Sequence, residues 1–105
     1  MLRLSLVLML LFASPVRADT GNYLYEQCTT DLDIAEAYCI GYSTAIVDAM
    51  NNSSPLFGWI ACVPDTVYMS QVADIGIRHL ANNPQDRHYN AASLIAEALS
   101  KAFPC

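Results

Sequence analysis

The chain has 105 residues and is acidic, with ten Asp and Glu against five Lys and Arg and a formal net charge of −5 at pH 7. This length suits one domain with a small hydrophobic core. The acidic balance argues against nucleic acid and anionic membranes as partners, and it is compatible with a basic protein partner.

Residues 1–18 have the composition of a secretory signal peptide. Arg3 is followed by an apolar run over residues 4–12, and Val16-Arg17-Ala18 places small or medium side chains where a signal peptidase reads them. The run is shorter than the roughly 20 residues that a membrane-spanning helix needs. We therefore predict cleavage after Ala18, one domain over residues 19–105, and no membrane anchor. That domain keeps three basic and ten acidic side chains, which gives a net charge of −7.

Residues 34–50 are predicted to form the central helix of the core. Apolar side chains recur there at helical spacing and define one face: Ile34, Tyr38, Tyr42, Ala45 and Ala49. Gly41 lies in mid-helix, where glycine costs roughly 1 kcal/mol relative to alanine. A second helix crossing close to Gly41, with Tyr42 closing over the contact, would explain the glycine, so we expect such a crossing.

The other elements are also predicted to be helical. A short first helix covers residues 21–28, and a third covers residues 67–81 with a buried stripe of Val72, Ile75, His79 and Leu80. A fourth helix is expected from Pro84, its first residue, to about Phe103, with Asn83 as its N-cap. No strand pattern is present. We predict an all-α fold, a small disulfide-stabilised bundle of about four helices.

Four cysteines remain after removal of the signal peptide: Cys28, Cys39, Cys62 and Cys105. An even number in an exported chain predicts two disulfides. The absence of a Cys-x-x-Cys motif argues against a zinc site and against thioredoxin-type chemistry. An antiparallel hairpin of the last two helices would return Cys105 to Cys62 and leave Cys28 to pair with Cys39. The pairing of Cys28 with Cys105 and of Cys39 with Cys62 is the alternative.

The segment over residues 51–60 is polar and rich in turn formers, including Pro55 and Gly58. Phe57 and Trp59 stand in it without helical periodicity. These aromatic side chains either fold back over the core or form an exposed surface that contacts a partner. Both interpretations remain open from the sequence.

Catalytic and metal-binding interpretations are weak. Gly41-Tyr42-Ser43 resembles half of a nucleophile elbow, but it lies within a predicted helix and Ala45 stands where a glycine is needed. His79 and His88 flank one turn, where capping or packing is the favoured role over metal binding. We expect no catalytic residue, no metal and no cofactor.

A series of short motifs runs through the whole of residues 19–105. It comprises Gly-Asn-x-Leu-x-x-x-Cys at 21–28, Tyr-Cys-Ile-Gly-Tyr at 38–42, Cys-Val-Pro at 62–64, His-Leu at 79–80, Asn-Pro at 83–84, Arg-His at 87–88 and a terminal Phe-Pro-Cys at 103–105. In this order the motifs resemble the Rap/Tai family of type VI secretion immunity proteins. Gly41, Tyr42, Pro64 and Pro84 belong to the shared pattern. The chain departs from the pattern at Ser43, Ala45 and Tyr68, where Thr66 is expected to take over a helix cap.

The resemblance implies a small helical periplasmic protein that is stabilised by disulfides and is often dimeric. Such proteins bind a peptidoglycan-cleaving amidase effector and occlude its active site. The implied role is therefore that of an inhibitor and not of an enzyme, with the cognate amidase as partner and a homodimer as a possible assembly. Phe57 and Trp59 are the candidate contacts, because binding hot spots favour large aromatic side chains.

Two other functional classes remain open from the sequence. A periplasmic chaperone of the small helical acid-stress type fits less well, because two disulfides and only two histidines disfavour acid-triggered unfolding. A small-ligand carrier would need an apolar cavity, for which a domain over residues 19–105 leaves little volume.

Overall fold

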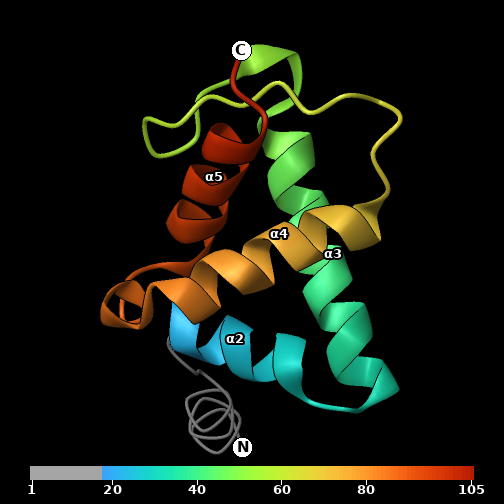
Figure 1. Ribbon diagram of the computed structural model, residues 1–105, viewed down its shortest axis with the longest axis vertical. Helices are drawn as coiled ribbons and strands as arrows, with labels where there is room; N and C mark the ends of the chain where they lie inside the picture. Colours follow the sequence, from blue (N-terminus) through green and yellow to red (C-terminus); the bar gives the residue numbers. More distant parts are fainter. Residues whose placement is uncertain (1–17) are drawn as a thin grey trace, which may run out of the picture.

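The computed structural model describes residues 18–105, which fold into four α-helices and two short 3-10 helices (Figure 1). The elements are α2 (Gly21–Thr29), α3 (Asp33–Ala49), η1 (Asn51–Ser53), α4 (Met69–Asn82), η2 (Pro84–Asp86) and α5 (Ala91–Ala102). Within residues 18–105 no strand forms, so the predicted all-α class is confirmed. In that same range no helix has the length and apolar character to cross a membrane. The predicted signal peptide, except Ala18, lies outside the described residues.

Local side-chain chemistry fixes where three of the helices begin. The Tyr23 N–H donates to Oγ1 of Thr20 at 3.2 Å, and the Ala92 N–H donates to Oδ1 of Asn90 at 2.9 Å. These bonds satisfy N–H groups that a helix leaves unpaired at its first turn. At the start of α4 the Tyr68 N–H donates to Oε1 of Gln71 at 2.8 Å. The N-cap of α4 is therefore Tyr68, and the expectation that Thr66 would cap this helix is wrong.

The most deeply buried helix is α5, and α2, α3 and α4 all pack against it. Its buried side chains are Ala91, Leu94, Ile95, Ala96, Ala98 and Leu99, whereas Ala102 near its end is exposed. The side chains that complete the core come from every other helix and from the long connection: Leu24, Ile46, Met50, Ala61, Val72 and Leu80. The protein therefore centres on α5, and the prediction that residues 34–50 form the central helix is wrong.

The face of α3 that lies against the core differs from the predicted one by about one residue. Its buried residues are Ala35, Cys39, Ser43 and Ile46. Ile34, by contrast, is 80% exposed, and Ala45 and Ala49 are also exposed, whereas Tyr38 and Tyr42 are half-buried. The shift has a covalent cause, because Cys39 must face α2 to reach Cys28.

The predicted close crossing at Gly41 is also wrong. A β-carbon built on Gly41 has nothing within 4 Å, so this glycine faces open space. Close approach occurs instead at Gly76 of α4, where a β-carbon would lie 2.9 Å from Cδ1 of Ile95. A β-carbon on Gly21 of α2 would likewise lie 2.5 Å from Cδ1 of Leu94, so the close approaches at glycine are those of α4 and of α2 to α5.

The region after α4 holds a 3-10 turn and a loop before the last helix begins. Pro84 is the first residue of η2, as its fixed φ favours, but the helix ends at Asp86 and α5 starts at Ala91. The predicted continuous helix from Pro84 to Phe103 is therefore wrong. The intervening residues pair with the N-terminal segment instead. The Gly21 N–H donates to the Tyr89 carbonyl at 2.9 Å, the Asn22 N–H to Arg87 at 2.7 Å, and the Ala91 N–H to Asp19 at 2.8 Å.

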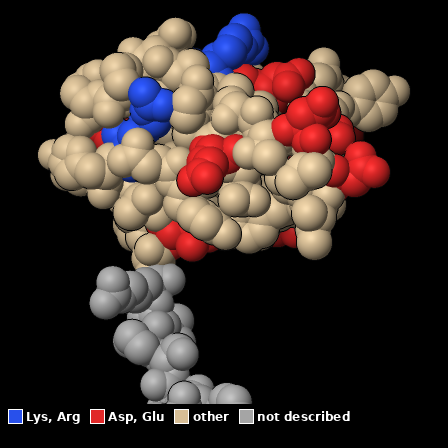
Figure 2. Space-filling view, turned by 90° about the horizontal axis from the view of Figure 1, so that it is seen from below, with Lys and Arg blue, Asp and Glu red and all other residues tan. Residues whose placement is uncertain are grey.

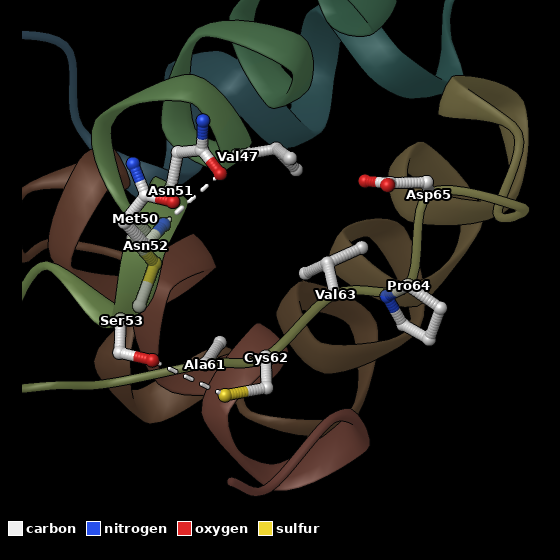
Figure 3. A pocket seen from close by; sticks show the side chains of 10 residues that line it. All are labelled: Val47, Met50, Asn51, Asn52, Ser53, Ala61, Cys62, Val63, Pro64 and Asp65. Atoms are coloured by element: carbon white, nitrogen blue, oxygen red, sulfur yellow. Dashed lines mark hydrogen bonds between the residues drawn. The ribbon is translucent and has the colours of Figure 1, made fainter.

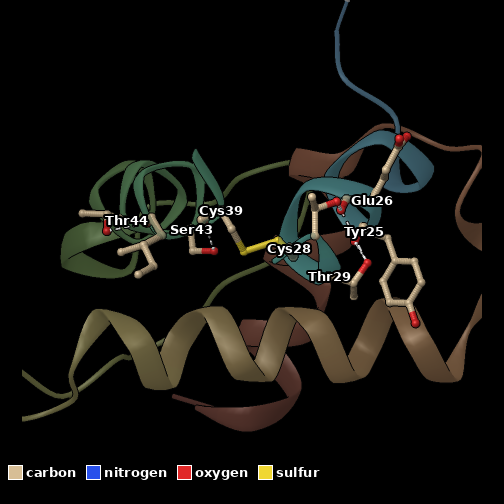
Figure 4. Close-up of a disulfide and its surroundings, with 9 residues drawn as sticks. Tyr25, Glu26, Cys28, Thr29, Cys39, Ser43 and Thr44 are labelled. Carbon is tan, nitrogen blue, oxygen red and sulfur yellow. Dashed lines mark hydrogen bonds between the residues drawn. A yellow bond between two sulfur atoms is a disulfide. The ribbon is translucent and has the colours of Figure 1, made fainter. Parts of the chain in front are cut away.

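Two disulfides join distant parts of the chain, and no cysteine among residues 18–105 is free. They link Cys28 to Cys39 and Cys62 to Cys105, the pairs preferred in the sequence analysis. The first fastens α2 to α3 (Figure 4). Beside it the buried Ser43 hydroxyl donates to the Cys39 carbonyl at 2.9 Å, so burying this polar group leaves no unpaired donor.

Candidate functional site

The connection between α3 and α4 runs over residues 50–68 and contains a tight two-residue turn. The Leu56 N–H donates to the Trp59 carbonyl and the Trp59 N–H donates to the Leu56 carbonyl, both at 2.9 Å. Phe57 and Gly58 occupy the tip, with φ of 51° and 81°. Two successive positive φ angles are typical of the type I′ turn, which favours Asn-Gly at these positions. Phe57 is therefore in a conformation that a bulky side chain rarely adopts.

Backbone strain in the described chain is concentrated in this connection. The non-glycine residues with positive φ among residues 18–105 are Asn52, Ser53 and Phe57. Such conformations persist only where the surroundings impose them, and they cluster at binding and catalytic sites. The connection is therefore the segment of this fold with the strongest structural sign of a function.

The two aromatic residues singled out from the sequence have different environments. Phe57 is 58% exposed at the tip of the turn, whereas Trp59 is half-buried and packs against the hydrophobic core. The two open interpretations of this segment thus divide between the two residues. Trp59 covers the core, and Phe57 is presented to solvent.

The connection is fixed at its base by the Cys62–Cys105 disulfide. The Cys62 N–H also donates to the Phe103 carbonyl at 2.9 Å, which holds the connection against the segment after α5. The Ser53 hydroxyl lies 3.4 Å from Sγ of Cys62 and 3.9 Å from Sγ of Cys105. The disulfide therefore joins Cys62, at one end of the strained segment, to the C-terminal Cys105, and Ser53, near the other end, lies against the two sulfur atoms.

A cavity of about 350 Å³ lies beside this base, between the end of α3 with η1 and the extended residues 61–65 (Figure 3). Figure 3 shows the side chains of Asp65 and Val63 directed into the opening, with Asn51 and Asn52 on the facing side. Pro64, a residue of the shared motif, lines the cavity as well. Sequence reasoning missed this cavity, because the path of the chain between its two walls, residues 47–53 and 61–65, depends on the backbone conformation of an irregular connection.

Acidic side chains are spread over the surface seen from the α2 side and are densest on one flank, whereas basic ones are few (Figure 2). A groove of about 230 Å³ between the α2–α3 turn and α4 is lined by four carboxylates, Asp31, Asp33, Glu36 and Asp74. In the part of the chain that the structure describes, both ion pairs involve Glu97, with Lys101 at 2.9 Å and with His79 at 3.4 Å. The surface available to a partner is thus predominantly acidic.

The other residues predicted to matter have structural roles. Tyr42 packs against the core from α3, and burial raises the pKa of its phenol, with the nearby Asp19 carboxylate acting in the same direction. Gly41-Tyr42-Ser43 lies within a helix, so it is not a nucleophile elbow. His79 lies beside Glu97, whereas His88 lies beside the ring of Tyr89 at 4.1 Å. Over residues 18–105 no three His, Cys, Asp or Glu side chains are grouped to hold a metal.

The arrangement suits recognition of a macromolecule. It combines an exposed aromatic tip on a covalently anchored turn with a neighbouring cavity that the Asp65 carboxylate lines, on a domain of net negative charge, and these features favour hot spots and charge steering. Comparison with curated proteins gives no significant match, and comparison with solved structures gives none either. The family profile described as Rap1a immunity proteins matches residues 20–105, from the N-cap of α2 to Cys105. The chain therefore belongs to the Rap1a immunity protein family.

Proposed function

We propose that this protein is a periplasmic immunity protein that binds a peptidoglycan-cleaving amidase effector of a type VI secretion system and occludes its active site. Membership of an immunity family supports a secreted effector as the partner. The amidase and the periplasm follow from the resemblance described above, together with the signal-peptide pattern of residues 1–18. Inhibition by binding requires no catalytic group, so we propose that the protein is not an enzyme.

The observation that carries this proposal is the exposed Phe57 at the tip of a strained, disulfide-anchored turn. An aromatic side chain has few rotatable bonds and loses little conformational entropy on binding, and burying it in a hydrolase groove removes a large apolar area from water. The cavity, with the Asp65 carboxylate on its wall, would then lie beside the contact. We place the inhibitory contact on the connection between α3 and α4.

Self-association is a further part of the proposal. The outward face of α3 carries Ile34, Gly41 and Ala45, all exposed, and the helix presents no large side chain at Gly41. Two copies related by a two-fold axis could pack these faces together, because small residues allow helices to approach closely. Light scattering on the exported protein and on an Ile34→Glu variant tests this, and a wild-type monomer at micromolar concentration would contradict it.

The function is tested by purifying the exported, oxidised chain together with the amidase encoded in the adjacent reading frame. We expect a stable complex in size-exclusion chromatography and loss of peptidoglycan hydrolysis at equimolar inhibitor. An amidase of the same class from an unrelated secretion cluster serves as the control and should remain active. Absence of a complex, or a complex that leaves hydrolysis unchanged, would contradict the proposal.

A further inference from the structure

We propose that the cavity beside η1 is an anchor pocket for one lysine or arginine side chain of the bound effector, with Asp65 as its counter-ion. The inference rests on the proposed function, because it assigns a partner group to the same connection that carries Phe57. The lining residues come from two segments, 47–53 and 61–65, which flank the Leu56–Trp59 turn in sequence. The segments that form the turn and line the cavity lie, with the C-terminal residues, at the end of the molecule opposite α2 (Figure 1).

The walls of the cavity match the stem of a long cationic side chain. Val47 and Val63 are half-buried, Met50 is buried, and Pro64 completes an apolar lining. Lysine and arginine bury their methylene groups against such surfaces while keeping the charged end near water. A volume of about 350 Å³ lies within the range of pockets that take ligand groups.

The polar groups of the cavity favour a cation at its mouth. The Asp65 carboxylate is exposed, points into the opening and has no ion-pair partner among residues 18–105 (Figure 3). Asn51 already accepts the Asn52 N–H at 3.0 Å through its Oδ1, so that oxygen helps to fix the facing wall. An ammonium or guanidinium group placed here donates a charge-assisted hydrogen bond to the Asp65 carboxylate.

The other classes of occupant fit less well. An anionic group would be repelled by Asp65. A purely apolar group would desolvate the carboxylate without offering it a hydrogen bond or an opposite charge. The three Lys and Arg residues of the described chain, Arg78, Arg87 and Lys101, do not line the cavity, so no basic side chain among residues 18–105 supplies a cation there. The net negative charge of the domain adds long-range attraction for a basic partner surface.

The cavity is held open before a partner arrives. Asn52 and Ser53, on one wall, have φ of 57° and 59°, and Ser53 lies against the Cys62–Cys105 disulfide, which carries the other wall. Strained backbone of this kind is maintained by its surroundings and is typical of preorganised sites. A preformed pocket loses less entropy on binding than one that must be ordered by its ligand.

The first test compares Asp65→Asn with Glu26→Gln in binding to the amidase. Both changes replace one exposed carboxylate by its amide, and Glu26 lies on α2 at the other end of the molecule. We expect Asp65→Asn to weaken the dissociation constant by at least about tenfold and to reduce its salt dependence, while Glu26→Gln changes it by less than about twofold. If the wild type binds and the two variants are indistinguishable, the pocket is overturned and the immunity function stands.

The partner residue is identified by charge exchange. Asp65→Lys should abolish binding, and replacing one lysine or arginine of the amidase by Asp should restore it in that pair alone. Restoration by no basic residue of the amidase surface would count against a single anchored cation.

A second test needs no effector, so it separates failure of the pocket from failure of the proposed function. The exported protein is titrated in NMR experiments with the N-acetyl methylamides of arginine, lysine and norleucine up to about 100 mM, since one side chain is expected to bind only in the millimolar range. The two cationic probes should shift the backbone amides of Asn52, Val63 and Asp65, and norleucine should not. Equal shifts with norleucine, no shifts with either cation, or shifts retained in Asp65→Asn would overturn the assignment.

Discussion

A β-carbon built on Gly76 of α4 would lie 2.9 Å from Cδ1 of Ile95, a core residue of α5 that is 1% exposed. The two helices therefore meet at a distance that only glycine allows without a shift of the isoleucine side chain. Gly41, in contrast, lies in mid-helix with open space beside it. The two positions form a matched pair, because both are helical glycines with opposite surroundings.

We expect Gly76→Leu to lower the free energy of unfolding by about 1–3 kcal/mol, because the added side chain overpacks the α4–α5 contact. Gly41→Ala should raise it by about 0.5–1 kcal/mol, since alanine is the better helix former and meets no atom of its own chain there. Urea unfolding of both variants provides the measurement. A neutral Gly76→Leu would mean that α4 and α5 separate easily at this crossing.

Phe57→Asn is expected to separate stability from inhibition. Asn-Gly is the favoured pair for a type I′ turn, so asparagine should relieve the positive φ of 51° and leave the free energy of unfolding unchanged or raise it by up to about 1 kcal/mol. Inhibition of the amidase should weaken at least about tenfold, or 1.4 kcal/mol, through loss of the aromatic anchor. Unchanged inhibition would move the contact surface away from this turn.

Trp59→Ala should behave in the opposite way. Trp59 packs against the core and is half-buried, so its truncation is expected to destabilise the fold by about 1–3 kcal/mol. Thermal unfolding measures this loss, and inhibition should be compared at a temperature where the variant is fully folded. A stable variant would show that the indole contributes little to the core.

The Cys62–Cys105 disulfide should contribute more stability than Cys28–Cys39. It closes a separation of 43 residues against 11, which corresponds to roughly 4 and 3 kcal/mol on the chain-entropy description. We would replace both cysteines of one disulfide by serine in each of two variants and measure their unfolding in denaturant. The variant without Cys62–Cys105 should lose more free energy of unfolding than the variant without Cys28–Cys39. Non-reducing mass spectrometry of the wild type should also show the loss of four hydrogens and no cysteine that alkylates.

Acid should selectively remove the contribution of Glu97. The hydrogen bond from Lys101 holds the pKa of Glu97 below its ordinary value, against the opposing effect of burial. A carboxyl group with a lowered pKa stabilises the fold above its unfolded pKa, and this contribution is lost as the pH falls through the folded pKa. The wild type should therefore have a larger free energy of unfolding than Glu97→Gln at pH 7, and this difference should shrink below about pH 5. Glu26→Gln, whose side chain has no pairing partner in the described chain, should show no such trend.

The all-helical class follows from the sequence, because helical periodicity and the absence of strand patterns are local properties. The face of α3 could not be fixed in the same way. Ile34, Tyr38 and Tyr42 recur at helical spacing, and so do Ala35, Cys39 and Ser43 one position later. Hydrophobicity favours the first set. The second set is buried instead, because Cys39 is bonded to Cys28 and the Ser43 hydroxyl is satisfied by a hydrogen bond within the helix.

The candidate site was only partly accessible from the sequence. Phe57 and Trp59 stand out by composition, but only the turn geometry shows that one is exposed and the other is packed on the core. The cavity could not be anticipated, since its walls depend on positive φ angles at Asn52 and Ser53 and on long-range disulfide closure. The Asn-Asn-Ser run was the available signal, because asparagine tolerates the left-handed region.

The pairing of the N-terminal segment with the loop before α5 imposes an order on folding. Gly21 and Asn22 are made early in synthesis, but their partners Tyr89 and Arg87 follow only after α2, α3 and α4 have been completed. Contacts of such long sequence separation form slowly, because a large loop must close first. A chain interrupted before residue 87 therefore lacks both the clamp on α2 and the central helix. The proposed inhibitory surface can therefore form only after nearly the entire domain has been synthesised and is free to fold.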